Sequence, residues 1–392
     1  MSPRFFRSAA LLLLALPLAA SAGEPVLLDF GRYLAKYPAM YATLSYADDA
    51  RDAIYDADGN KQSGVAPTYG RGSRFPERRA DVQFEWFFPF FETEALPFIS
   101  SRLWTARATL GYARPAAKGP IADYAASHEL RGAQSGITDI ALQFGPVLYG
   151  SADWRTRSDT PLSVLLLGEL SLPVGRRDPD AAVNAGSNVF SYGATLGAYW
   201  RPIAGVLVDG GAHWRAYSKN DEPAFDAQEP SHLGSLWSLD ATLAVRIWRS
   251  LYASGSYYDA RGADDEYNNV RASAHPQPAT MPLMDSFPAP GTFRDAGTRD
   301  RRAAAAIHWF ALQRLRLSLH YVLPLSGRSG EFDLPYEQQL QDCVALPTGC
   351  SPSANGSDHV DGLGGARVYA SRYFLLSATW NFGQGDFWLS GP

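Results

Sequence analysis

SLWSLDATLAVRIWRSLYASGSY, residues 235–257, carries an apolar side chain at nearly every second position on both sides of the link Arg249-Ser250. Alternation with a period of two is the pattern of a β-strand that has one apolar and one polar face. A link of about two residues between two such runs indicates a hairpin. The stretch therefore predicts two adjacent antiparallel strands.

The same alternation recurs between Met40 and Phe382, and the links between the alternating segments are long and short in turn. Antiparallel strands joined in this way are typical of an up-and-down β-barrel in a bacterial outer membrane, with long external loops and short periplasmic turns. A soluble sandwich would also alternate, but its Greek-key links have no reason to sort by length. The sequence predicts an all-β transmembrane antiparallel barrel of about 12 strands, with roughly 10–14 compatible with the pattern. The tight links are expected at 201–203, 249–250 and 311–313, and the longest loops at 260–302 and 324–368.

Aromatic residues stand near the ends of the outward-facing sets, as at Trp200, Trp237, Trp309 and Trp380. Indole rings suit the membrane boundary, where one edge of the ring meets lipid and the other meets water. The alternative, an aromatic-rich core of a soluble sandwich, does not explain the ordering of the links. The outward faces are therefore expected to contact outer-membrane lipid.

The first residues resemble an export signal. Arg4 and Arg7 precede an apolar run over residues 9–19 and the small residues Ala20-Ser-Ala22. This order predicts a secretory signal peptide and export by the Sec route, whereas a membrane anchor is disfavoured because the run is short and Pro17 interrupts it. The expected parts are a signal peptide over 1–22, a short periplasmic or lumen segment over 23–38, the barrel over 39–382 and a tail over 383–392.

The charge pattern excludes several classes of function. The formal net charge is −5 and no basic run stands out, so a nucleic-acid partner is not expected. No HExxH, phosphate loop or CxxC pair occurs, and no cofactor is expected. Acidic loop positions, such as Asp178, Asp264 and Glu266, are consistent with Ca²⁺ ligands or with solvated loop tips. A barrel of this kind would need the cellular barrel-insertion machinery as a partner.

Polar and charged residues alternate with the apolar ones and are expected to line the lumen, because an arginine facing lipid at the midplane would cost about 2–4 kcal/mol. Either these residues pair across the lumen and hold the wall together, or some form a polar path or recognition ring. Their mixed signs disfavour a strongly ion-selective pore. The lumen-lining candidates are Glu85, Arg107, Asp139, Gln143, Glu169, Asp209, His213, Arg215, Asp240, Arg246, His308, Arg314, Arg316 and His320.

Inward-facing histidines raise the question of a lipid-modifying enzyme, which would need a Ser–His pair at the lipid boundary. Ser318 lies two residues before His320 on the same face, about 6.6 Å away by strand rise, which is too far for a hydrogen bond. That face is also directed away from lipid. We therefore expect no catalytic and no metal-binding residues.

Two cysteines, Cys343 and Cys350, lie in one Pro-, Gly- and Ser-rich stretch. In an oxidising compartment they favour a local disulfide. The alternative, a pair of metal-binding thiolates, has only His359 nearby as a further ligand.

Three short segments carry a resemblance to a known family: Ser135-Gly-Ile-Thr-Asp-Ile140, Leu172-Pro-Val-Gly-Arg-Arg-Asp178 and Asn184-Ala-Gly-Ser-Asn188. Together they resemble outer-membrane proteins associated with the phenol meta-cleavage pathway, which are distantly similar to the fatty-acid and toluene channel barrels. The resemblance implies uptake of small hydrophobic or aromatic compounds, which the proline- and aromatic-rich loop 260–302 would capture. Residues 23–38 offer no counterpart of the long N-terminal hatch of fatty-acid channels. The competing hypothesis is a structural or interaction barrel whose lumen is plugged by ion pairs, and a lipid-modifying enzyme is the third.

Overall fold

A computed structural model describes the chain over residues 32–33, 39–55, 59–63, 72–89, 103–127, 129–149, 162–181, 183–220, 231–263, 266–267, 270–271, 292–294, 298–328, 331–335, 357–359 and 369–382. The predicted signal peptide, the tail 383–392 and both cysteines lie outside these residues. Among the described residues, no helix combines the length and hydropathy needed to cross a membrane.

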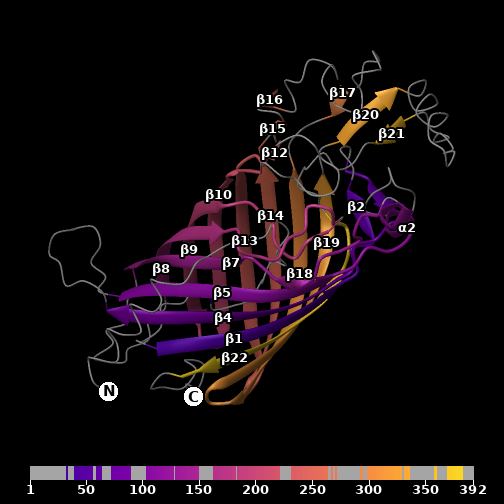
Figure 1. Cartoon of the computed structure of the whole chain (residues 1–392). Helices are drawn as coiled ribbons and strands as arrows, with labels where there is room; N and C mark the ends of the chain where they lie inside the picture. Colours follow the sequence, from indigo (N-terminus) through magenta and orange to yellow (C-terminus); the bar gives the residue numbers. More distant parts are fainter. Residues whose placement is uncertain are drawn as a thin grey trace.

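Twelve long antiparallel strands close into a barrel (Figure 1). Each strand pairs with its neighbours in the chain, and closure comes from the pairing of the first strand with the last, where Tyr41 lies opposite Asn381. The prediction of a twelve-stranded up-and-down barrel is confirmed. The strands are β1 (Ala39–Asp49), β4 (Glu77–Pro89), β5 (Leu103–Pro115), β7 (Ile140–Tyr149), β8 (Leu162–Leu172), β9 (Ser191–Ile203), β10 (Val206–Tyr217), β13 (Leu236–Trp248), β14 (Leu251–Gly262), β18 (Arg299–Leu312), β19 (Leu315–Arg328) and β22 (Tyr373–Asn381).

Alternating exposure along each strand shows which face points outward. In β13, Trp237, Leu239 and Leu243 are exposed, whereas Ser238, Asp240 and Thr242 are buried. The outward residues are the apolar ones, as expected of a wall that faces lipid. The period-two pattern in the sequence therefore assigned the two faces of the wall correctly.

Tight turns close the barrel at the end opposite the long loops. The turn Arg249-Ser250 is where the sequence predicted it, but two others lie one to three residues later than predicted, since they occupy 204–205 and 313–314. Gly205 has a φ of 81°, a backbone conformation that glycine adopts without strain. The Ala204-Gly205 pair was thus the better turn signal than the preceding Pro202.

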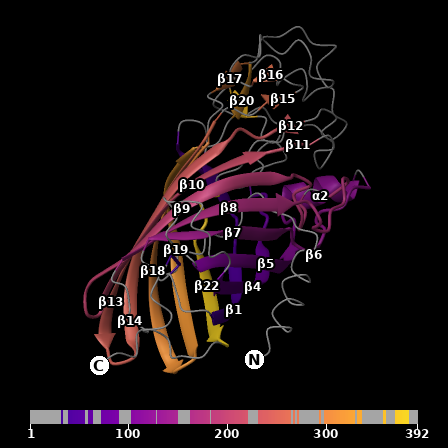
Figure 2. The ribbon, with the colours of Figure 1, turned by 90° about the vertical axis from the view of Figure 1, so that its left-hand side faces the viewer.

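The long-loop end carries additional secondary structure (Figures 1 and 2). A small apolar core of Ile54, Phe75 and Ile121 joins two different loops there. The elements at this end are β2 (Ala53–Tyr55), β3 (Lys61–Ser63), α2 (Pro120–Ser127), β6 (Gly136–Ile137), β11 (Lys219–Asn220), β12 (Ser231–His232), β15 (Glu266–Tyr267), β16 (Val270–Arg271), β17 (Thr292–Arg294), β20 (Glu331–Pro335) and β21 (Ser357–His359).

Candidate functional site

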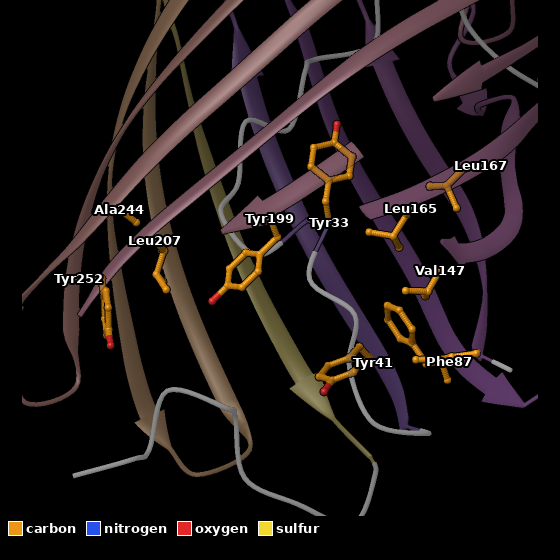
Figure 3. Packing of buried hydrophobic residues seen from close by; sticks show 11 residues of the cluster. Tyr33, Tyr41, Phe87, Val147, Leu165, Leu167, Tyr199, Leu207, Ala244 and Tyr252 are labelled. Carbon is orange, nitrogen blue, oxygen red and sulfur yellow. The ribbon is translucent and has the colours of Figure 1, made fainter. Parts of the chain in front are cut away.

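The lumen has an apolar layer near the short turns. Ten strands each contribute one inward side chain to this layer, and these residues pack into one cluster together with Tyr33 and a second residue of β8, Leu167 (Figure 3). We call this layer the collar. Its members are Tyr41, Phe87, Leu103, Val147, Leu165, Tyr199, Leu207, Ala244, Tyr252 and Phe310. The two remaining strands contribute Arg316 and Thr379 near this level, joined by a hydrogen bond of 3.2 Å.

Above the collar, toward the long loops, the inward faces of seven adjacent strands carry a chain of polar side chains that we call the belt. Each strand from β4 to β13 contributes one member. Because a buried polar group is costly without a partner, such residues are stable only if they bond to one another or to backbone. The belt consists of Glu85, Arg107, Gln143, Glu169, Thr195, His213 and Asp240.

The first part of the belt links four strands through Arg107. Its Nε donates to Glu85 at 2.7 Å, and its Nη1 donates to the side-chain oxygen of Gln143 at 3.2 Å. The Nε2 of Gln143 then donates to Glu169 at 2.7 Å. These residues are cross-strand neighbours, since Arg107 lies opposite both Glu85 and Gln143 in the register. The bonds therefore follow directly from which residues the register brings together.

The second part of the belt is centred on Glu169 and His213. The Thr195 hydroxyl donates to Glu169 and lies 2.6 Å from Nδ1 of His213. The other ring nitrogen of His213 lies 2.5 Å from Asp240. Arg215 adds a further bond to Glu169 at 3.2 Å. Buried carboxylates and cations are thus paired along the whole belt, which disfavours a lumen that selects ions of one sign.

A short piece of the N-terminal segment lies inside the barrel against the belt. The phenol of Tyr33 donates to Asp240 at 2.8 Å, and the hydroxyl of Ser163 donates to the Tyr33 carbonyl at 2.9 Å. Arg107 donates to the carbonyl of Arg32. Residues 32 and 33 are therefore hydrogen-bonded to belt residues on well-separated strands, Arg107 on β5 and Asp240 on β13.

Two glycines form the seat of the Tyr33 ring. Gly197 and Gly211 lie opposite each other on β9 and β10. A Cβ on Gly197 would lie 2.1 Å from Cδ1 of Tyr33, and one on Gly211 would lie 2.3 Å from its hydroxyl oxygen. Any side chain at these positions would displace the ring. Neither the seat nor Tyr33 was predicted from the sequence, although two glycines at inward positions of adjacent strands were a usable signal.

The opposite side of the lumen is lined mainly by hydroxyl groups, and we call it the hydroxyl side. His308 lies between two of them, 2.8 Å from the Ser254 hydroxyl and 2.9 Å from that of Ser318. Further along, hydroxyl pairs join neighbouring strands, at 2.8 Å between Thr242 and Ser256 and at 3.0 Å between Thr43 and Thr379.

Ser318 therefore has a histidine within hydrogen-bond distance across the strands, His308, whereas the sequence suggested only His320, on the same strand, as a neighbour. His308 is fully buried and its ring contacts that of His320. Both polar neighbours of His308 in these bonds are serines, and a nucleophilic pair would need an acidic or amide group to orient the histidine. The arrangement is that of satisfied buried polar groups.

Most lumen-lining candidates lie on inward faces, but two do not. Arg314 is exposed in the turn 313–314, because β18 continues to Leu312. Asp139 precedes β7 and lies among the long loops. The inward set is Glu85, Arg107, Gln143, Glu169, Asp209, His213, Arg215, Asp240, Arg246, His308, Arg316 and His320.

Asp139 joins the three segments that carried the family resemblance. Its carboxylate accepts the backbone N–H of Gly175 at 2.7 Å and that of Ser187 at 2.5 Å. A Cβ on Gly175 would lie 2.6 Å from Cα of Gly186, so only glycine allows the two loop strands to approach this closely. The motifs thus build one structural unit of the long-loop end, in which a buried carboxylate is satisfied by backbone amides.

Comparison with known proteins agrees with this arrangement. A family model described as "Putative MetA-pathway of phenol degradation" matches residues 83–280, which is half of the chain. This chain belongs to that family. Within it, the matched region includes the belt from Glu85 to Asp240 and both glycines of the Tyr33 seat.

A solved outer-membrane barrel shares the fold of this phenol-degradation family member. An outer-membrane channel of Pseudomonas putida F1 has 12% sequence identity and a TM-score of 0.59, with 90% of this chain and 99% of that chain covered. A FadL homologue of Pseudomonas aeruginosa has 10% identity and a TM-score of 0.39, with 94% and 99% covered. No curated protein sequence is significantly similar to this chain.

Proposed function

We propose that this family member is an outer-membrane channel for small hydrophobic or aromatic molecules, with its long loops outside the cell. The observation that carries the proposal is the collar, in which the inward side chains of ten strands are apolar or aromatic. Export by the signal peptide over 1–22 and assembly by the barrel-insertion machinery belong to the same proposal. The family's link to phenol degradation and the channel fold of its relative support it.

The collar distinguishes this lumen from that of a general diffusion pore. A narrow apolar constriction excludes water and the ions that water carries. An apolar solute loses little on entering such a layer, because it has no hydration shell that must be replaced. The collar therefore favours passage of apolar molecules over salts and sugars.

The belt and Tyr33 give the channel a closed resting state. Tyr33 is held by Asp240 and Ser163 on two separate strands, and its ring fills the space left by Gly197 and Gly211. Solute passage at this level requires the ring to leave its seat or to shift within it. Conductance of the resting protein should consequently be low.

The test is uptake of a radiolabelled small aromatic hydrocarbon into proteoliposomes, measured beside uptake of a sugar and planar-bilayer conductance. We expect faster hydrocarbon entry than in protein-free vesicles, with little sugar uptake and low conductance. Leu207→Asn, which places an amide in the collar, should slow hydrocarbon entry. Leu312→Asn is the matched control, because Leu312 is exposed at the same end of the barrel.

A second candidate is a barrel that transports nothing and serves as a structural or interaction protein. The continuous pairing of the belt favours it, since paired charges and a seated Tyr33 close the lumen. Hydrocarbon uptake equal to that of empty vesicles, unchanged by Tyr33→Ala, would establish this candidate. Large and steady conductance of the unmodified protein would instead indicate a general pore.

A further inference from the structure

Three arginines gather on the outer face of the barrel at its long-loop end. They lie on two adjacent strands, β14 and β18, around a single carboxylate, that of Asp259. They are Arg261, Arg299 and Arg301, and we call this set the outer arginine patch.

The strand register brings these side chains together. Asp259 lies opposite Arg301, and Arg261 lies opposite Arg299. The carboxylate of Asp259 is 3.2 Å from Nε of Arg301, 3.5 Å from Nη2 of Arg299 and 3.4 Å from Nη2 of Arg261.

The outer arginine patch lies at the edge of the lipid-facing surface. On β13, the neighbours of Asp259 and Arg261 are Leu239 and Trp237, which are 60% and 61% exposed. Tyr257, two residues before Asp259 along the same face of β14, is also exposed. Trp237 belongs to the aromatic residues expected at the membrane boundary. The arginines thus stand where an apolar outer wall gives way to the loops.

One carboxylate cannot satisfy three guanidinium groups. Each guanidinium has five N–H donors in a planar fork that matches phosphate oxygens. The side chains of Arg299 and Arg301 are 35% and 34% exposed, so they remain open to a ligand from the membrane side.

We propose that the outer arginine patch binds the phosphate groups of lipid A, the phosphorylated glycolipid of the outer leaflet. The proposal rests on the proposed outer-membrane orientation, which puts the long-loop end in that leaflet. Phosphates at the boundary would meet arginines positioned for bidentate hydrogen bonds, while the acyl chains contact the apolar wall below. Binding would hold a lipid molecule against strands β14 and β18.

The experiment measures lipid retention by native mass spectrometry of the purified full-length protein. The probes are bisphosphorylated lipid A, the monophosphorylated form and inorganic phosphate. Arg299→Gln combined with Arg301→Gln leaves Asp259 with Arg261 as its partner. The control combines Arg249→Gln with Arg314→Gln, which removes two exposed arginines from the turns at the opposite end. Arg299→Lys with Arg301→Lys keeps the charge but loses the planar fork.

We expect the glutamine variant to bind bisphosphorylated lipid A at least about tenfold more weakly, or about 1.4 kcal/mol, and the control to bind as the unmodified protein does. The lysine variant should bind with intermediate affinity. The unmodified protein should bind the monophosphorylated lipid more weakly than the bisphosphorylated one, whereas the glutamine variant should not distinguish the two lipids. Equal binding by the glutamine variant and the control would overturn the proposal. Displacement of the lipid by millimolar inorganic phosphate would show a site for free anions instead. Hydrocarbon uptake into vesicles without lipid A is independent of all these outcomes, so failure here leaves the channel function separately testable.

Discussion

The two sides of the lumen use different polar chemistry. On the belt side, charged residues such as Arg107, Glu169 and Asp240 are linked from strand to strand. On the hydroxyl side, the links are between serine, threonine and histidine, as at Ser254 and His308. These bonds reduce the cost of burying polar atoms, although the hydroxyls of Thr105, Tyr373 and Ser377 have no hydrogen-bond partner among the described residues.

The difference between the two sides lies in what else they bind. The described hydrogen bonds of Tyr33 are all with the belt side, through Asp240, Ser163, His213 and Asp209. Hydrogen bonds that involve a charged partner are stronger than neutral ones. Charge in this lumen therefore serves to seat the N-terminal segment, whereas the hydroxyl side mainly joins its own strands.

The largest effect should come from removing a carboxylate of the belt. Glu169→Leu leaves Arg215 and the belt members around it without their acceptor, and Glu169 is only 7% exposed. We expect the free energy of unfolding to fall by about 3–5 kcal/mol, because an uncompensated buried charge remains. Urea-induced unfolding, followed by tryptophan fluorescence in lipid vesicles, provides the measurement.

The matched control for Glu169→Leu is Asp48→Asn. Asp48 pairs with Arg78 at 3.4 Å, but its side chain is 54% exposed. Exposed ion pairs contribute about 0–1 kcal/mol, so the loss should fall in that range. Similar losses in the two variants would mean that the belt does not stabilise the barrel more than a surface pair does.

An intermediate effect is expected from filling the seat of Tyr33. In Gly197→Ala the new Cβ would lie 2.1 Å from the ring, so the ring must leave. We expect a loss of about 1–3 kcal/mol from overpacking, together with increased conductance of the channel. Gly255→Ala is the control, since a Cβ there meets nothing within 4 Å.

A double variant makes the test of the seat specific. Once Tyr33→Ala has removed the ring, Gly197→Ala should have little further effect on stability or conductance, because the two positions are coupled only through that ring. If the two substitutions add independently, then the seat is not what Gly197 provides.

The smallest effect is expected on the hydroxyl side. Thr242→Val removes a hydroxyl that donates to Ser256 at 2.8 Å and keeps the shape of the side chain. One neutral hydrogen bond contributes about 0.5–1.5 kcal/mol. A loss as large as that of Glu169→Leu would remove the distinction between the two sides. The same unfolding measurement applies.

The sequence predicted the wall of the barrel well because the period of side chains and the order of links are local properties. Twelve strands, their outward faces and the turn at Arg249-Ser250 could all be read directly. Arg314 was assigned to the lumen because the turn was placed one to two residues too early. An error of this size changes the face of a residue, since the side-chain period is two.

Asp139 was misplaced for a different reason. Alternation identifies a residue as inward only while the strand lasts, and Asp139 stands just before β7 begins. Its partners, Gly175 and Ser187, are separated from it by more than thirty residues of sequence. No local pattern could show that these backbone amides would surround the carboxylate.

By itself, the sequence determined the membrane-barrel architecture, because each strand's faces and each link's length are encoded within about ten residues. The tertiary structure alone decided how inward residues are arranged in layers. An alternation with a period of two determines which face of the wall a side chain lies on, but not its position along the barrel axis. Leu165 in the collar and Glu169 in the belt therefore have the same local pattern. Only the cross-strand register and the entry of Tyr33 into its glycine seat separate the apolar layer from the charged one.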